Sequence, residues 1–136
     1  MGEFKVVIGT KAGKTYQKVV KSPEADTLLK KHLGDTVAGE EIGFPGYEFQ
    51  VTGGSDKCGF PMRAGIQQAR KRVLISGGVG FSGKNRHGVK QKGIFQRTTI
   101  CGEMITKIIH QVNLKALKEG PQALAEVAAP VESKKE

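Results

Sequence analysis

The sequence predicts a mostly β protein of the α+β type: a small bent sheet or barrel, one short helix near residues 23–33 and a short C-terminal helix. Two observations predict this class. Runs of β-branched residues recur along the chain, and turn residues, including many of the 19 glycines, separate them. The 136 residues suit one hydrophobic core. We therefore expect a single β-rich domain over 1–128 and a polar tail over 129–136.

The first third of the chain predicts a hairpin followed by a helix. Residues 3–9 (EFKVVIG) and 15–21 (TYQKVVK) are β-branched runs joined by a glycine-bearing turn, which is typical of a hairpin. Ser22 then offers a helix cap, and a proline and two acidic residues follow it in the first turn. A leucine stripe predicts a helix over 23–33, and Gly34 ends it.

The rest of the chain predicts separate strands and one long loop. Residues 47–52 alternate apolar and polar side chains, as a half-buried strand does. A glycine-rich loop is expected at 77–93, and a short Ala/Leu helix is expected at 121–128. The further extended segments are expected at 70–76, 94–101 and 105–116.

The net charge of +9 comes from one part of the chain. Residues 57–102, called the basic block below, hold ten Lys and Arg and no Asp or Glu, whereas the segments on either side are close to neutral. An ordinary protein surface mixes both signs, because charges of one sign repel each other. A block without carboxylates therefore favours a polyanionic partner, and nucleic acid fits this better than a membrane since no amphipathic helix is expected there.

Two glycine motifs suggest nucleotide binding, but their context argues against it. Residues 9–15 (GTKAGKT) are one residue too short for a phosphate-binding loop and lead into a strand rather than a helix. Gly78, Gly80 and Gly83 match G-x-G-x-x-G after an apolar run, yet a polar, glycine-rich stretch follows where a helix is needed. These glycines, interleaved with cations, instead suit a flexible strap along a phosphate backbone.

No arrangement of residues predicts an enzyme, a cofactor or a metal site. The serines lack an organised histidine, and Cys58 and Cys101 are isolated, without a C-x-x-C spacing or paired histidines. No apolar run is long enough to span a membrane, and the N-terminus does not have the pattern of a secretory signal. We expect a cytoplasmic protein without a small-molecule substrate.

Residues 53–65, GGSDKCGFPMRAG, resemble the signature of the small-subunit ribosomal protein S-six family of archaea and eukaryotes. The similarity continues into GYEFQVTGG before this stretch, RVLIS after it and the later QVNLKALKEG, roughly residues 1–120 in all. The length matches the shorter archaeal members. The matching signature positions are Gly53, Gly54, Ser55, Asp56, Lys57, Gly59, Phe60, Pro61, Met62 and Arg63.

The resemblance implies a small β-barrel and a structural ribosomal protein, with small-subunit rRNA and neighbouring ribosomal proteins as partners. Phe60, Pro61 and Met62 are expected to pack under their loop, and at least one cation of 70–72 is expected to be structural or merely solvated. The alternatives are a ribosome-associated maturation factor that binds RNA and, far less favoured, a nucleotide-binding enzyme that uses residues 78–83. The residues expected to contact RNA are Lys57, Arg63, Arg70, Lys71, Arg72, Lys84, Arg86, His87, Lys90, Lys92 and Arg97.

Overall fold

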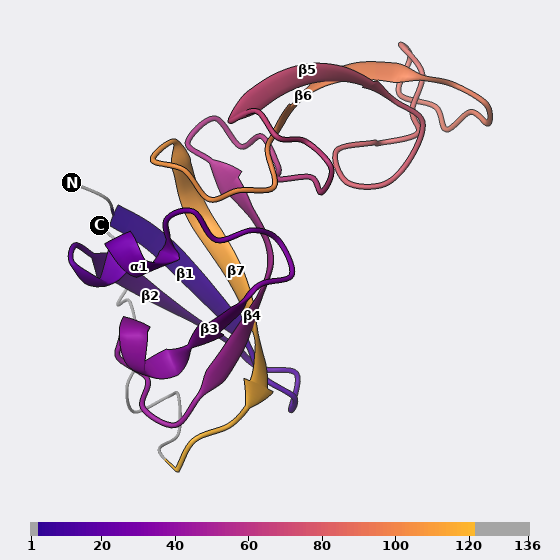
Figure 1. Cartoon of the computed structure of the whole chain (residues 1–136). Coiled ribbons are helices and arrows are strands. Elements are labelled where there is room, and N and C mark those ends of the chain that lie inside the picture. Colours follow the sequence, from indigo (N-terminus) through magenta and orange to yellow (C-terminus); the bar gives the residue numbers. More distant parts are fainter. Residues whose placement is uncertain (1–2, 122–136) are drawn as a thin grey trace, which may run out of the picture.

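The structure, a computed structural model, describes residues 3–121 and is predominantly β (Figure 1). The class predicted from the sequence is confirmed. A short α-helix and one turn of 3₁₀ helix accompany the strands. The elements in chain order are β1 (Glu3–Gly9), β2 (Thr15–Lys21), α1 (Glu24–Leu28), β3 (Thr36–Ala38), η1 (Gly39–Ile42), β4 (Glu48–Asp56), β5 (Arg70–Ile75), β6 (Gln96–Cys101) and β7 (Ile109–Lys118).

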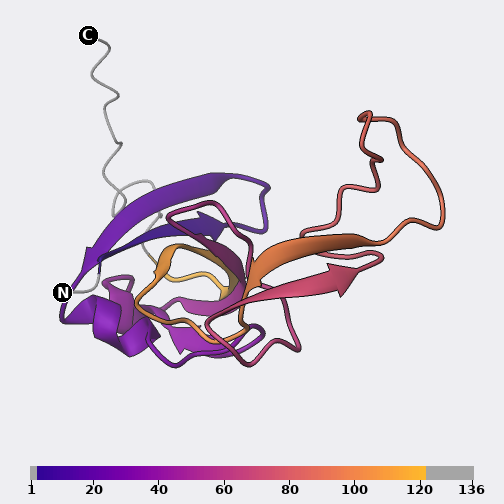
Figure 2. The ribbon, with the colours of Figure 1, turned by 90° about the horizontal axis from the view of Figure 1, so that it is seen from above.

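Five strands form one curled sheet in the order β2-β1-β7-β4-β3 (Figure 2). β1 and β7 pair in parallel, and the other neighbours pair antiparallel. The predicted β1–β2 hairpin is confirmed, and its turn occupies the stretch that resembled a phosphate-binding loop. Register irregularities interrupt the β4–β7 pairing at three places, and such bulges bend a strand and increase its twist.

The curled sheet encloses the main core. Alternate side chains of β1, β4 and β7 point inward, and α1 and η1 add apolar side chains to them. Phe49 stacks with Tyr47 at 5.6 Å between ring centroids and meets Phe44 edge-on at 5.8 Å. These ring arrangements are the favourable ones for aromatic pairs, so the three rings fix one end of the core.

The helix predicted over 23–33 is shorter than expected. It covers Glu24–Leu28, and Pro23 rather than Ser22 occupies the cap position. Beyond Leu28 the backbone leaves the helix, because residues 30–33 hydrogen-bond to residues 103–105 instead. Tertiary pairing thus overrides the local preference for helix. The helix expected at 121–128 falls almost wholly outside the described residues and stays a prediction, as do the proposed domain limits.

β4 is longer than the sequence predicted and runs through the glycine pair to Asp56. Gly54 permits this, because a Cβ at this position would lie 2.5 Å from the carbonyl oxygen of Gln111 and 2.8 Å from Met62 Sδ. The strand that carries the signature motif therefore passes too close to β7 and to the following loop for any side chain.

β5 and β6 form a separate two-stranded sheet that projects from one end of the curled sheet (Figures 1 and 2). We call β5, β6 and the loop between them, residues 70–101, the arm. Ile75 and Ile100 are buried within it but do not belong to the main core cluster, so the arm has a small apolar centre of its own. The glycine-rich stretch predicted to be a loop joins the two strands.

The arm meets the rest of the molecule at Gly102, which follows β6. Its N–H donates to the Ala69 carbonyl at 3.2 Å. A Cβ here would lie 2.1 Å from the carbonyl oxygen of Gln68 and 3.0 Å from that of Ile66. At this glycine the chain segments on the two sides of the arm therefore touch backbone to backbone.

We predict that Gly102→Ala lowers the free energy of unfolding by at least about 2 kcal/mol, because backbone atoms must move to admit the methyl group. Gly77→Ala is the matched control. Gly77 has no positive φ, and no atom lies within 4 Å of the place its added methyl group would take, so this change is expected to be neutral or slightly stabilising. Urea unfolding measures both, and equal stability of the two variants would contradict the prediction.

Candidate nucleic-acid interface

The basic block forms the arm and the loop that leads to it. The carboxylates closest to the arm in the chain, Asp56 and Glu103, both make hydrogen bonds within the protein. Asp56 is buried, and Glu103 Oε2 accepts from the Gly65 N–H at 3.1 Å. Among the described residues, Arg70 is the only cation of the basic block that forms an ion pair. The other nine Lys and Arg of the block have no carboxylate partner there, so their positive charge is not neutralised within this part of the chain.

Asp56, at the end of β4, joins the sheet to the arm. Its Oδ1 accepts from the Phe60 N–H at 2.9 Å, and its Oδ2 accepts from the Arg70 guanidinium. Cys101 Sγ lies 3.4 Å from the same Oδ2. The Arg70 guanidinium also lies 5.4 Å from the centre of the Phe60 ring. One carboxylate therefore connects the β4–β5 loop, β5 and β6.

These contacts shift the pKa values of the Asp56 carboxyl group and of the Cys101 thiol. Burial alone would raise the pKa of Asp56, but hydrogen bonds from Phe60, Arg70 and Cys101 outweigh it and lower that pKa below its ordinary value. Burial, followed by the hydrogen bond to the Asp56 carboxylate, raises the pKa of the Cys101 thiol to about 11. Asp56 is therefore ionised and Cys101 is a neutral thiol at physiological pH.

The Phe60-Pro61-Met62 stretch packs beneath the loop, as predicted. Met62 is buried in the main core, and the half-buried Phe60 packs against that core. Arg63 follows, and its Nη1 donates to the carbonyl oxygens of Gly77 and Val79, at 2.8 Å each. The phosphate contact expected for Arg63 stays a prediction, and in the structure its guanidinium holds the start of the arm's loop.

One face of the arm is covered by this loop. Cross-strand pairing places Ile75 and Ile100 on the same face as Lys71. Gly80 of the loop comes so close that a Cβ would lie 3.1 Å from Ile100 and 3.8 Å from Ile75. The glycine motif of 78–83 therefore packs the loop onto the arm, and no helix follows it within the described chain.

The opposite face of the arm is open and carries arginines. Arg72 pairs with Thr99 across the strands, and Leu74 pairs with Arg97. Arg72, Leu74 and Arg97 are all exposed, whereas Arg70 on the same face is turned to Asp56. Side chains alternate along a strand, so Arg70 and Arg72 share this face and Lys71 lies on the other.

The loop at the far end of the arm is folded rather than an open strap. Asn85 Oδ1 accepts from the N–H groups of His87 and Val89, and the Asn85 N–H donates to the Val89 carbonyl at 2.8 Å. Gln96 Nε2 donates to the Lys84 carbonyl at 2.6 Å and ties this turn to β6. The cations predicted from the sequence in this loop are all on its surface: Lys84, Arg86, His87, Lys90 and Lys92.

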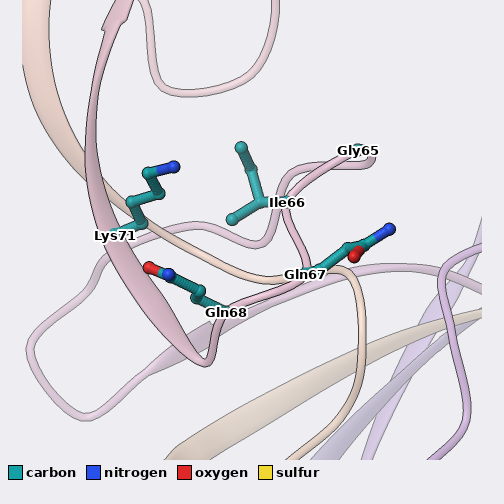
Figure 3. Close-up of a pocket in the computed structure, with 5 residues that line it drawn as sticks. All are labelled: Gly65, Ile66, Gln67, Gln68 and Lys71. Atoms are coloured by element: carbon teal, nitrogen blue, oxygen red, sulfur yellow. The ribbon is translucent and has the colours of Figure 1, made fainter.

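A pocket of about 290 Å³ lies at the base of the arm (Figure 3). Ile66, Gln68 and Lys71 surround one space, and Gln67 is turned away from it. The lining offers amides, an ammonium group and an apolar side chain, but no carboxylate, thiol or imidazole. It holds no pair of groups suited to proton transfer or nucleophilic attack.

The remaining residues predicted to contact RNA are also on the surface. Lys57, next to Asp56 in the β4–β5 loop, is exposed. The end of β4 that precedes this loop lies at the same end of the molecule as the arm (Figure 1). Within residues 3–121 no group of three or more His, Cys, Asp or Glu side chains is arranged to hold a metal ion. In the same range no helix has the length and apolar character needed to cross a membrane.

The chain combines a curled β sheet, a projecting basic arm and a Gly-Gly-Ser-Asp strand end, and its sequence matches a family of ribosomal proteins. The model of the family described as ribosomal protein S6e matches residues 4–129. The chain therefore belongs to the ribosomal protein S6e family, as its resemblance to the S-six signature predicted.

Curated archaeal relatives agree with this assignment. The chain is 42% identical to the small ribosomal subunit protein eS6 of Archaeoglobus fulgidus, covering 92% of this chain and 95% of that protein. It is 39% identical to the eS6 of Methanocella arvoryzae, covering 100% and 92% of the two chains. The eS6 of Thermoplasma acidophilum is 38% identical, with 89% and 93% covered.

Sequence analysis missed the role of Asp56 as the anchor of the arm. The bond from the Phe60 N–H is the local contact that an Asp in a turn commonly makes. The pairing with Arg70 and the contact with Cys101 join residues 14 and 45 positions away. The one sequence feature that indicates this role is the position of Asp56, directly before a block of 46 residues that contains no carboxylate.

We predict that Asp56→Asn destabilises the protein near neutral pH and that the difference from the wild type shrinks as the pH falls below about 4. The pKa of Asp56 is lowered on folding, so its ionised form contributes stability above the pKa of the unfolded chain. That contribution is lost as the pH falls toward the pKa of the folded protein. Loss of the charged acceptor is expected to cost about 1–3 kcal/mol near neutral pH. Urea unfolding at a series of pH values measures it.

Glu48→Gln is the control for that experiment. Glu48 pairs with Lys118 at 3.1 Å on the surface, and an exposed pair of this kind contributes at most about 1 kcal/mol. A stability difference for Asp56→Asn that does not vary with pH, or that is no larger than that for Glu48→Gln, would show that Asp56 is not the anchor.

The two cysteines are expected to differ sharply in reactivity. Cys58 is exposed, whereas Cys101 is buried and its thiol pKa is about 11. At pH 8 a disulfide reagent should titrate one thiol rapidly and the second only after denaturant is added, because the thiolate is the reactive form. Cys58→Ser should abolish the rapid phase. Two rapid phases in the wild type would mean that the base of the arm opens readily.

Proposed function

We propose that this chain is a structural constituent of the small ribosomal subunit and that it binds rRNA through the arm and the β4–β5 loop. The proposal rests on one observation above all: ten Lys and Arg without an intervening carboxylate occupy one projecting end of the molecule. The names of the archaeal relatives supply the ribosomal context. On this proposal the protein works in the cytoplasm, with neighbouring ribosomal proteins as further partners.

The proposed mechanism is neutralisation of phosphate charge by a surface of fixed shape, without a chemical reaction. Each Lys or Arg that meets a phosphate releases condensed counterions, which supplies affinity that depends on salt. The open face of the arm is the preferred surface, since the loop covers the other face. Arg72 and Arg97 protrude there without a carboxylate partner among residues 3–121.

The eleven residues predicted to bind RNA divide by what else they contact. Arg70 and Arg63 already bind groups of the protein, so we assign them mainly to holding the arm. The other nine are assigned to RNA contact, with those on the open face of the arm as the primary ones. Replacing Arg70 would release Asp56 and disturb the arm, so Arg70 is a poor test of RNA contact.

We predict that Arg72→Ala and Arg97→Ala each weaken binding to small-subunit rRNA and each reduce the slope of log K against log salt by about 1. Filter binding or fluorescence anisotropy over a range of KCl concentrations measures this slope. Both side chains are exposed and make no ion pair within the described chain that the change would remove, so the fold is expected to be retained.

Lys11→Ala is the matched control. Lys11 is an exposed cation in the turn between β1 and β2, at the end of the sheet remote from the arm (Figure 1). It is expected to leave both affinity and slope unchanged. Failure of the wild-type protein to bind rRNA would refute the proposed function, and equal effects of Lys11→Ala and Arg72→Ala would refute the assignment to the arm.

A further inference from the structure

The arm exposes apolar side chains as well as cations. Five large apolar side chains of the described residues are exposed, and four of them lie on the arm: Leu74, Val79, Val89 and Phe95. Single exposed apolar residues are common on protein surfaces, but a concentration of them at one place indicates a binding surface. Contact with phosphates alone would not require them.

Phe95 stands out within this group. It is 66% exposed, and every other Phe and Tyr side chain of residues 3–121 is buried or half-buried. The residue that follows it, Gln96, is held through both its backbone and its side chain. Its backbone pairs with Ile75 in the arm sheet, and its side-chain amide donates hydrogen bonds to the Ser82 hydroxyl and the Lys84 carbonyl. The phenyl ring is therefore carried on an ordered backbone while remaining open to solvent.

The surroundings of Phe95 favour a nucleic acid as its partner. It lies in the basic block, so an acidic partner is required, and Lys92 and Arg97 flank it in the sequence. Duplex RNA offers phosphates and sugars, but a ring that projects into solvent finds a matching flat surface only on an unstacked base. Stacking of a base on an aromatic ring tolerates any base, because each base has a π face.

We propose that Phe95 stacks on an unpaired base of the bound RNA, so that the arm recognises single-stranded or looped RNA as well as phosphate charge. This inference rests on the proposed function and adds to it the kind of RNA bound. Phosphate contacts by Arg72 and Arg97 set the position of the strand, and the ring contributes affinity that does not depend on salt.

The chain has no tryptophan, which makes a direct test possible. Phe95→Trp introduces a single tryptophan at the proposed contact, and Val19→Trp places one at a 37% exposed position on β2, outside the arm. On titration with small-subunit rRNA, stacking is expected to quench the emission of Phe95→Trp strongly and that of Val19→Trp little. Equal quenching in both would overturn the proposal.

Affinity measurements complete the test. Phe95→Ala is expected to weaken binding about 5- to 100-fold with an unchanged salt slope, whereas Val19→Ala has no effect. A fully paired RNA duplex offers no unpaired base, so its affinity for Phe95→Ala should equal its affinity for the wild type. Because Phe95 is exposed, the thermal midpoint of Phe95→Ala should match that of the wild type, which excludes unfolding as the cause.

The outcomes separate this inference from the function on which it rests. If the wild type binds rRNA and Arg72→Ala reduces the salt slope, but Phe95→Ala binds as tightly as the wild type, stacking is refuted and the proposed function stands. If the wild type does not bind rRNA, the proposed function itself fails. If Phe95→Ala keeps full RNA affinity and loses binding to purified small-subunit proteins, the ring contacts protein and the inference is wrong.

Discussion

The arrangement of the molecule depends on one buried carboxylate. Asp56 ends β4, and from there it holds the β4–β5 loop through the Phe60 N–H, β5 through Arg70 and β6 through Cys101. A buried ion must be satisfied by several partners to be tolerated, and removing any partner leaves the charge under-compensated in a low-dielectric environment. The direction in which the arm leaves the sheet is thereby tied to a set of bonds that must form together.

This anchor explains why the arm can be so basic. Like charges destabilise a compact structure, and the arm carries no carboxylate that could offset them. The arm is held instead by contacts at its base: Asp56 with Arg70, Arg63 with two loop carbonyls, and the backbone approach at Gly102. Two cations are thus used for structure, and the others are left on the surface where a polyanion can reach them.

Local patterns predicted much of the fold but not its long-range contacts. The β1–β2 hairpin and the alternation in β4 follow from residue spacing alone, because both depend on near neighbours. The helix was predicted too long because residues 30–33 pair with residues 103–105, a contact that no local pattern reveals. The charge pattern was enough to single out residues 57–102 as the candidate interface, whereas the division of its cations between structure and surface required the register of β5 with β6 and the position of Asp56.

The glycine motif at 78–83 shows that the same sequence pattern can have different structural roles in different proteins. In a dinucleotide-binding turn, glycines let a phosphate approach a helix terminus. Here Gly80 instead lets the loop approach Ile100 and Ile75, and Arg63 holds the loop by its carbonyls. Because the loop closes one face of the arm in this way, the exposed arginines Arg72 and Arg97 lie on the other face. It also means that a larger residue at Gly80 would act on the proposed RNA surface indirectly, by lifting the loop from the arm rather than by removing a contact with a ligand.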